Sequence, residues 1–136
     1  MSVVKEPYKK RPPVMSVRIE DTMDVMIVRD TTRRAASLIG FSPAFRAQLA
    51  GAASSLAELV LKTHDPHIIH LNGIINGLQN GLQISVDTPW LMGVSENNIK
   101  IALQSKMGEL VDEIILLGED PPAIFLVMWL TPEREI

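Results

Sequence analysis

The chain has 136 residues, of which 46% are hydrophobic, and it carries 13 Lys and Arg against 16 Asp and Glu. A chain of this length is typical of one domain that buries about two-thirds of its unfolded surface, so it needs no metal or disulfide staple. The absence of cysteine excludes a thiolate nucleophile and a cysteine zinc site. The formal charge of −3 does not favour a nucleic acid partner, because binding to phosphates requires an excess of positive charge.

The chain shows no membrane-spanning run and no secretory signal, because its apolar stretches are too short and its first residues are polar. We therefore expect a cytoplasmic protein. Residues 1–13 combine three prolines with four Lys and Arg, which predicts a flexible basic tail. This tail is interpreted either as a solubilising terminus or as a contact for an acidic partner or nucleic acid. Residues 14–132 are assigned to a single domain, and residues 133–136 to a second short tail.

The first predicted element is an edge strand from Val14 to Glu20, where apolar and polar residues alternate. A second short strand is predicted from Asp24 to Arg29, on the run Val-Met-Ile-Val. Thr31 or Thr32 then caps a helix that ends at Gly40, because glycine accepts the left-handed conformation of a helix terminus. These features predict two strands followed by a short helix.

Ser42 and Pro43 begin the next predicted helix, with serine as the N-cap and proline in the first turn. Apolar residues then recur at helical spacing. The helix should end near Thr63, because Asp65 precedes a proline and avoids helical angles.

A hairpin is predicted from two strands, Ile68 to Leu71 and Leu82 to Val86. Between them the Asn-Gly pair occurs three times at a period of four residues, beginning at Asn72, Asn76 and Asn80. Asn-Gly is a strong hairpin signal because both residues tolerate a positive φ. Three candidates leave the register of the turn open.

Ser95 is expected to cap a third helix whose buried stripe runs from Ile99 to Ile114, and Ile114 to Leu117 is interpreted as already extended. The continuous apolar run from Ala123 to Leu130 predicts a final strand that is covered on both faces. The fold class that follows is α+β, a two-layer sandwich with the helices on one face of a mixed, mainly antiparallel sheet.

Three segments together resemble the anti-sigma-factor serine kinases of the GHKL (Bergerat-fold) ATPase superfamily, which include the switch kinases of bacterial stress signalling. The first segment is the opening from Asp24 to Ser42, which ends in Gly-Phe-Ser, and the second is the helix from Ala50 to Lys62. The third is Leu110 to Glu113, followed by Phe125 to Leu130. The resemblance covers about Asp24 to Leu130 and implies the histidine-kinase-type ATPase fold.

The helix from Ala50 to Lys62 departs from the pattern of active kinases at two positions. The resemblance places the catalytic glutamate at Ser55 and the magnesium-binding asparagine at Leu59. A serine cannot act as a carboxylate base, and a leucine offers magnesium no oxygen. Glu58 lies about 100° around the helix from Leu59 and should point elsewhere.

The glycines that admit and wrap a nucleotide are also missing. Asp87 matches the aspartate that reads adenine in the family, but Thr88 to Met92, which includes Pro89 and Trp90, stands where glycines are expected. The segment from Val94 to Leu103, where the resemblance places the phosphate lid, contains no glycine. Backbone N–H groups cannot approach phosphates closely without such glycines. Of the nucleotide-handling positions, only Asp87 is intact, and Ser55, Leu59 and Trp90 mark a degenerate pocket.

Other polar groups suggest no separate site. His67 and His70 are three apart in an extended segment and should face opposite sides of a strand, which disfavours a metal site with His64. The acidic cluster is interpreted as a solvated rim or as a surface for a basic partner; its members are Glu109, Asp112, Glu113, Glu119 and Asp120. Trp129 is expected in the core.

These observations predict a non-catalytic regulatory domain that binds protein, with no ATP, magnesium or other cofactor. We expect Leu59, Trp90, Leu91 and Met92 to fill the volume that nucleotide occupies in active relatives. The partners that the resemblance implies are a STAS-domain antagonist, a sigma factor or a second copy, the last through an edge strand such as Val14 to Glu20. The alternative is an ATP-dependent anti-sigma or switch serine kinase with a rebuilt site, using Glu58 or Glu96.

Overall fold

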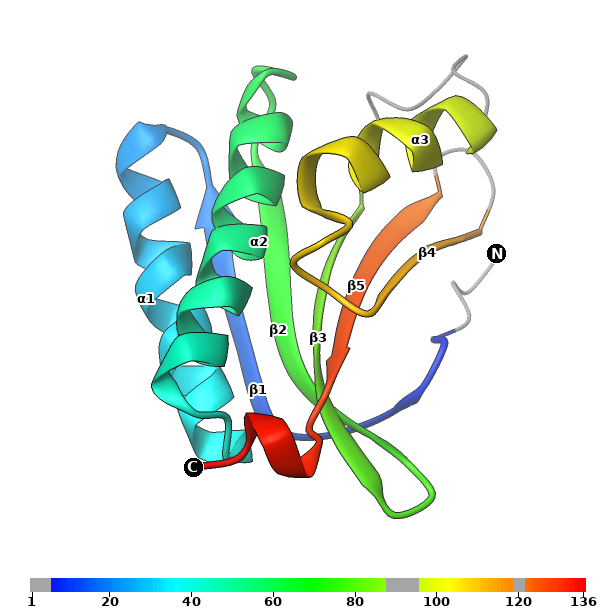
Figure 1. Ribbon diagram of the computed structural model, residues 1–136. Coiled ribbons are helices and arrows are strands. Elements are labelled where there is room, and N and C mark those ends of the chain that lie inside the picture. Colours follow the sequence, from blue (N-terminus) through cyan, green and yellow to red (C-terminus); the bar gives the residue numbers. More distant parts are fainter. Residues whose placement is uncertain (1–5, 88–95, 119–121) are drawn as a thin grey trace.

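The computed structural model describes residues 6–87, 96–118 and 122–136. It is an α+β protein in which three helices pack against a five-stranded antiparallel sheet (Figure 1). The elements in chain order are β1 (Lys9–Ile19), α1 (Thr22–Ile39), α2 (Pro43–Leu61), β2 (His67–Asn76), β3 (Gln79–Asp87), α3 (Glu96–Met107), β4 (Glu113–Leu117), β5 (Ala123–Trp129) and a short 3-10 helix η2 (Pro132–Arg134). The described part contains no helix long and apolar enough to cross a membrane.

The strand order is β1-β2-β3-β5-β4, so β1 and β4 form the two edges of the described sheet. Every pairing in the described sheet is antiparallel. The sequence predicted a mixed sheet, and that part of the prediction was wrong. The connection from β3 through α3 to β4 joins two strands that run in the same direction, but β5 lies between them and is antiparallel to both, so no two described neighbours are parallel. The three helices lie together in front of the sheet in Figure 1.

The main core lies between the sheet and the helices. Each strand contributes alternate residues to it, as a pleated strand must, and these are Val17, Ile19, Ile69, Leu71, Leu82, Ile84, Val86, Ile114, Leu116, Ile124, Leu126 and Met128. A second, smaller cluster occupies the other face of the sheet, where Tyr8 and Ile115 pack against Ile74, Val127 and Trp129. Because β5 lies between the two clusters, all seven of its residues are buried, which confirms the prediction of a strand covered on both faces.

The segment from Asp24 to Arg29, predicted as a strand, is helical, and that prediction was wrong. Asp21 is the N-cap of α1, where it accepts the backbone N–H of Met23 while Asp24 accepts the backbone N–H groups of Glu20 and Asp21. These two hydrogen bonds lower the pKa of Asp24. This capping box starts the helix before the β-branched run, and Val25 and Val28 then face the core one turn apart.

Several local predictions are confirmed. Gly40 ends α1 with a φ of 119°, in the left-handed region that glycine tolerates. Pro43 begins α2, although the Ser42 side chain makes no capping hydrogen bond. The predicted hairpin is present, and its register, which the sequence left open, uses the second Asn-Gly pair, because Asn76 pairs with Gln79 and Gly77 has a φ of 64°. Ser95, the expected cap of α3, lies outside the described residues.

The segment predicted as a flexible tail is partly strand, because β1 begins at Lys9. Lys9 to Arg11 pair with Gly73 to Ile75, and a register shift follows before Val14. Prolines are tolerated in this stretch because an edge strand need not donate on its free side. Glycine is required at position 73, since a Cβ there would come within 2.5 Å of the Pro12 carbonyl oxygen.

The C-terminal segment, also predicted as a tail, is attached to the helices. The Arg134 carbonyl accepts the N–H of Ser42, and the N–H of Ile136 donates to Gly40. Arg134 also forms an ion pair with Asp112 and lies 5.5 Å from the centre of the Phe45 ring. These contacts join the end of the sheet to the connection between α1 and α2.

Candidate functional site

Ser55 and Leu59, the two positions at which the sequence departs from the kinases it resembles, lie on α2. Ser55 is half-buried, and Leu59 is half-buried with its side chain packed against the main core. Glu58, next to Leu59 in sequence, is exposed, so the helix turns its carboxylate away from the surface that Leu59 occupies. These two residues of α2 offer a hydroxyl and an apolar side chain, and neither supplies a carboxylate base or a metal-binding oxygen.

The other serine of this segment has a structural role. Ser54 is buried, donates to the Ala50 carbonyl at 2.9 Å and accepts from Nε of Arg29 at 3.1 Å. This contact joins α2 to α1. The Ser54 hydroxyl therefore donates one hydrogen bond within α2 and accepts another from α1, and it helps to pack the two helices together.

Asp87 ends β3 on the edge of a different pocket. Val86 points into the main core, and the residue that follows it along the strand belongs to the opposite face. Asp87 accordingly lines a cavity of about 160 Å³ on the side of the sheet away from the helices, with His70, Ser85 and Phe125. The structure does not bring Asp87 into one pocket with Ser55 and Leu59.

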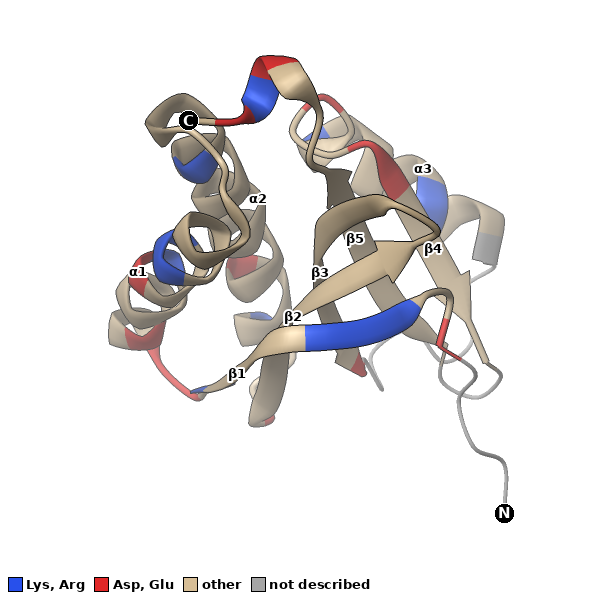
Figure 2. Ribbon diagram, turned by 90° about the horizontal axis from the view of Figure 1, so that it is seen from below, with Lys and Arg blue, Asp and Glu red and all other residues tan. Residues whose placement is uncertain are grey.

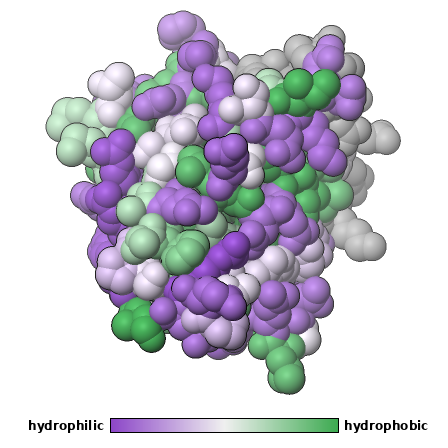
Figure 3. Space-filling view, viewed as in Figure 1, coloured by the Kyte–Doolittle hydropathy of each residue, from purple (hydrophilic) through white to green (hydrophobic). Residues whose placement is uncertain are grey.

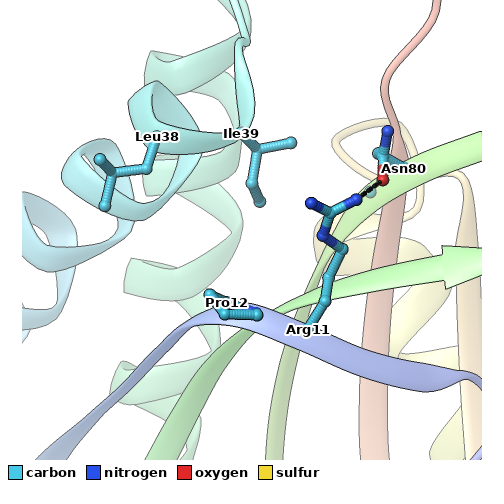
Figure 4. A pocket seen from close by; sticks show the side chains of 6 residues that line it. Arg11, Pro12, Leu38, Ile39 and Asn80 are labelled. Carbon is cyan, nitrogen blue, oxygen red and sulfur yellow. Dashed lines mark hydrogen bonds between the residues drawn. The ribbon is translucent and has the colours of Figure 1, made fainter.

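Four pockets with linings in the described residues contain no residue of α2. The loop that was expected to fill the nucleotide volume, with Trp90, Leu91 and Met92, lies outside the described residues, as does Val94 at the start of the expected lid. The described pocket near the carboxyl end of α1 is small, about 80 Å³, and Arg11 donates a hydrogen bond to Asn80 across it (Figure 4). A pocket of that volume is below the roughly 300 Å³ at which small-molecule sites begin.

The histidines follow the strand geometry that the sequence predicts. His67 is buried and His70 is exposed, so the two face opposite sides of β2. The ring of His67 donates from Nδ1 to the Asp87 carbonyl at 3.1 Å, and its Nε2 lies 2.8 Å from the Thr63 hydroxyl. His67 thus connects the end of α2 to the end of β3. In the described part, no three His, Asp or Glu side chains gather in a metal-binding cluster.

Two members of the acidic cluster are not the solvated rim that was expected. Glu113 accepts hydrogen bonds from Tyr8 and from the Trp129 indole, and Asp112 accepts from Arg134 and from the backbone N–H of Trp129. Burial raises the pKa of Asp112, but the hydrogen bonds from Arg134 and Trp129 outweigh it, so the net pKa is lowered. Both carboxylates hold the structure together. Glu119 and Asp120 lie outside the described residues.

A surface that the sequence analysis did not single out lies where α1 passes β1. It forms a groove of about 520 Å³ lined by Met15, Ser16, Val17, Arg18, Asp24, Ile27, Thr31 and Arg34. The signal was hidden because Val25 to Val28 was interpreted as a strand. Once that segment is placed on a helix, Met23, Met26 and Ile27 fall on its outer side, where each is more than half exposed.

No protein-family model matches this chain, and no curated protein matches it.

Proposed function

We propose that this protein is a non-catalytic regulatory domain that binds another protein, built on the histidine-kinase-type ATPase fold but without a working nucleotide site. The observation that carries the proposal is Leu59. In an active kinase of the type the sequence resembles, this position supplies a magnesium ligand, and here its side chain packs against the core. Phosphoryl transfer depends almost wholly on positioning and metal electrostatics, so losing that ligand removes more than a contact.

Two further features support the proposal. The packing of α2 against the core on one face of the sheet agrees with the two-layer arrangement that the resemblance implies, although the described sheet is antiparallel throughout. Exposed methionine and isoleucine side chains on α1 favour a protein partner, because flexible apolar side chains are common at protein-binding surfaces.

Isothermal titration of the protein with Mg-ATP tests the loss of nucleotide binding. We expect no heat of binding at micromolar affinity. Micromolar binding would overturn the proposal and favour the alternative, a serine kinase with a rebuilt site. In that case Glu58→Gln tests the base directly, because Glu58 is exposed and its loss leaves the core intact.

The partners proposed from the resemblance are a STAS-domain antagonist or a sigma factor. A second copy of the chain is the other candidate. The residues of β1 include four cations and no anion, so pairing of two β1 strands would set like charges against one another. Light scattering separates the two, since a monomer of 15.0 kDa supports a different protein as partner and a stable dimer supports a second copy.

A further inference from the structure

Strand β1 is an open edge of the sheet. It pairs with β2 on one side, and in the described part of the chain no strand pairs with its other side. Edge strands present a row of unpaired backbone groups, to which a further strand can add. The opposite edge is β4, which has only five residues, whereas β1 has eleven. Of the two edges, β1 therefore offers the longer template.

The groove between α1 and β1 follows this free edge. Met15 and Val17 belong to the helix-covered face of β1, and Ser16 and Arg18 belong to the other face, yet all four line the groove. A cavity reached from both faces of one strand must run along that strand's side. Its volume of about 520 Å³ lies in the range of roughly 300–1,000 Å³ typical of ligand sites.

Apolar side chains border the groove. Val14 on β1 is 72% exposed, and on α1 Met23 and Met26 are 75% and 64% exposed. Ile27, which lines the groove itself, is 51% exposed. Figure 3 shows apolar side chains at the surface over α1, on the left of the view. An added strand would cover part of this apolar surface with alternate side chains.

The charge beside the groove is positive. Residues 1–46 contain nine Lys and Arg against five Asp and Glu, whereas residues 47–136 contain four against eleven. Figure 2 shows that the longest basic stretch of β1 lies at the start of the strand, away from α1, so the charge at the groove itself comes from the residues that line it. Within the described part, Arg34 lines the groove with no hydrogen bond or ion pair, and Arg18 is bonded only to the exposed Glu20. Asp24 also lines the groove, with its carboxylate accepting the backbone N–H groups of Glu20 and Asp21, so the lining carries two arginines against one aspartate and favours a carboxylate partner by one net positive charge.

We propose that an extended segment of a partner protein, alternating apolar and acidic residues, binds in this groove as a sixth strand beside β1. The inference rests on the proposed protein-binding function and names the surface that performs it. The segment's backbone pairs with the free edge, its apolar side chains contact Met15 and Ile27, and its carboxylates face Arg18 and Arg34. A nucleic acid fits this groove less well, because it has no peptide backbone to pair with the free strand edge and its phosphates gain nothing from the apolar walls.

The probe is a phage-displayed library of random decapeptides, selected on the full chain. We expect enriched peptides that alternate apolar residues and carry more Asp and Glu than the starting library. A synthetic peptide of the consensus should protect the amides of Val14 to Ile19 from hydrogen exchange. Methylating its alternate backbone nitrogens should abolish binding, because strand addition needs those N–H groups.

Arg34→Gln and Arg33→Gln form a matched pair, since each removes one positive charge from the same helix. We expect Arg34→Gln to weaken the peptide about fivefold to tenfold, and Arg33→Gln, which is paired with Asp30 outside the groove, to change binding less than about twofold. Circular dichroism confirms that both variants fold.

The proposal is overturned if no peptide is enriched, if the enriched peptides lack acidic residues, or if protection appears away from β1. Displacement of the peptide by single-stranded oligothymidylate, or a dimer that blocks the same edge, would also overturn it. None of these outcomes alters the Mg-ATP titration. Binding of ATP would refute the proposed function, but the peptide measurements could still be interpreted. Failure of the proposed function and failure of the peptide site are therefore distinguishable.

Discussion

Tyr8 meets Trp129 edge to face, with the ring centroids 4.8 Å apart and the planes at 83°. Both side chains donate to the same carboxylate, the tyrosine hydroxyl at 2.6 Å and the indole at 2.5 Å from the oxygens of Glu113. This contact holds the N-terminal segment on the sheet face that the helices leave open. The hydrogen bond from Tyr8 to Glu113 joins residues 105 positions apart in the chain, and its strength can be tested by experiment.

The first prediction concerns the ionisation of Tyr8. The hydrogen bond to Glu113, then burial, then the negative charge of Glu113 raise its pKa from 10.0 to about 12. A raised folded pKa gives stability that is present below pH 10 and lost as the pH rises through about 12. Since the chain has one tyrosine, alkaline absorbance reports Tyr8 alone.

We expect a native midpoint near pH 12, a midpoint near 10 in urea, and a midpoint shifted back toward 10 in Glu113→Gln, which keeps an acceptor but removes the charge. A native midpoint near 10 in the unaltered protein would show that Tyr8 is not held by Glu113 in solution.

The second prediction concerns the pair of Asp112 and Arg134, whose nitrogen and oxygen atoms approach to 2.6 and 2.8 Å. Arg134→Ala should lower the free energy of unfolding by about 2 kcal/mol, because hydrogen bonds to charged groups contribute about 1.5–3 kcal/mol. Arg134→Lys keeps the charge but not the two-pronged geometry, and it should recover only part of that loss. Urea unfolding measures both variants.

The pH dependence of this pair follows from the lowered pKa of Asp112. A depressed folded pKa gives stability that is present above the unfolded value and lost as the pH falls through the folded value. The difference in stability between the unaltered protein and Asp112→Asn should therefore be full at neutral pH and shrink below the ordinary value of 3.8. A difference that is independent of pH would contradict this account.

The third prediction compares two glycines. Gly73→Ala would place a Cβ 2.5 Å from the Pro12 carbonyl oxygen and 2.9 Å from that of Arg11, so the backbone of β1 must shift. We expect a loss of about 1–3 kcal/mol, as for other overpacked sites. Gly51→Ala is the control: its Cβ meets only Leu110 at 3.8 Å within a helix, and it should stabilise the protein by up to about 1 kcal/mol. Equal effects of the two changes on thermal unfolding would refute this interpretation.

The fourth prediction restores the two kinase residues, in the double variant Ser55→Glu and Leu59→Asn. We expect no micromolar Mg-ATP binding, because the sequence still lacks glycines from Thr88 to Met92 and from Val94 to Leu103. Leu59→Asn should also cost about 1 kcal/mol or more, since it removes a half-buried apolar side chain from the core. Calorimetry on each single variant and on the double variant separates these effects, and micromolar binding by the double variant would show that the glycines are dispensable.

The local features were predictable from sequence where neighbouring residues decide them. Gly40 ends a helix because few other residues accept its φ, and Pro43 starts one because proline needs no donor in the first turn. The buried face of β2 and the exposed position of His70 follow from strand alternation alone. Ser55 and Leu59 fall on α2 as predicted, because Ser42 and Pro43 mark the start of that helix and apolar residues recur along it at helical spacing.

The predictions that failed depended on competing local signals. Val25 to Val28 favours a strand by composition, but Asp21 and Asp24 form a capping box that starts a helix three residues earlier. The spacing of Val25, Val28 and Thr32 along one helical face was the available signal, and all three are buried. Weighing helical spacing over β-branched content would have found α1, and with it the groove beside β1.

Composition and local sterics are enough to specify an α+β domain with a helix ending at Gly40 and a fully buried last strand. The assignment of a serine and a leucine to the positions of a base and a metal ligand comes from the resemblance to anti-sigma serine kinases, and it stays a prediction. The tertiary structure decided which Asn-Gly pair turns the hairpin, where Tyr8 docks, and which side of the sheet Asp87 faces. Those outcomes depend on contacts between residues far apart in the chain, and their free energies arise only once the sheet has assembled.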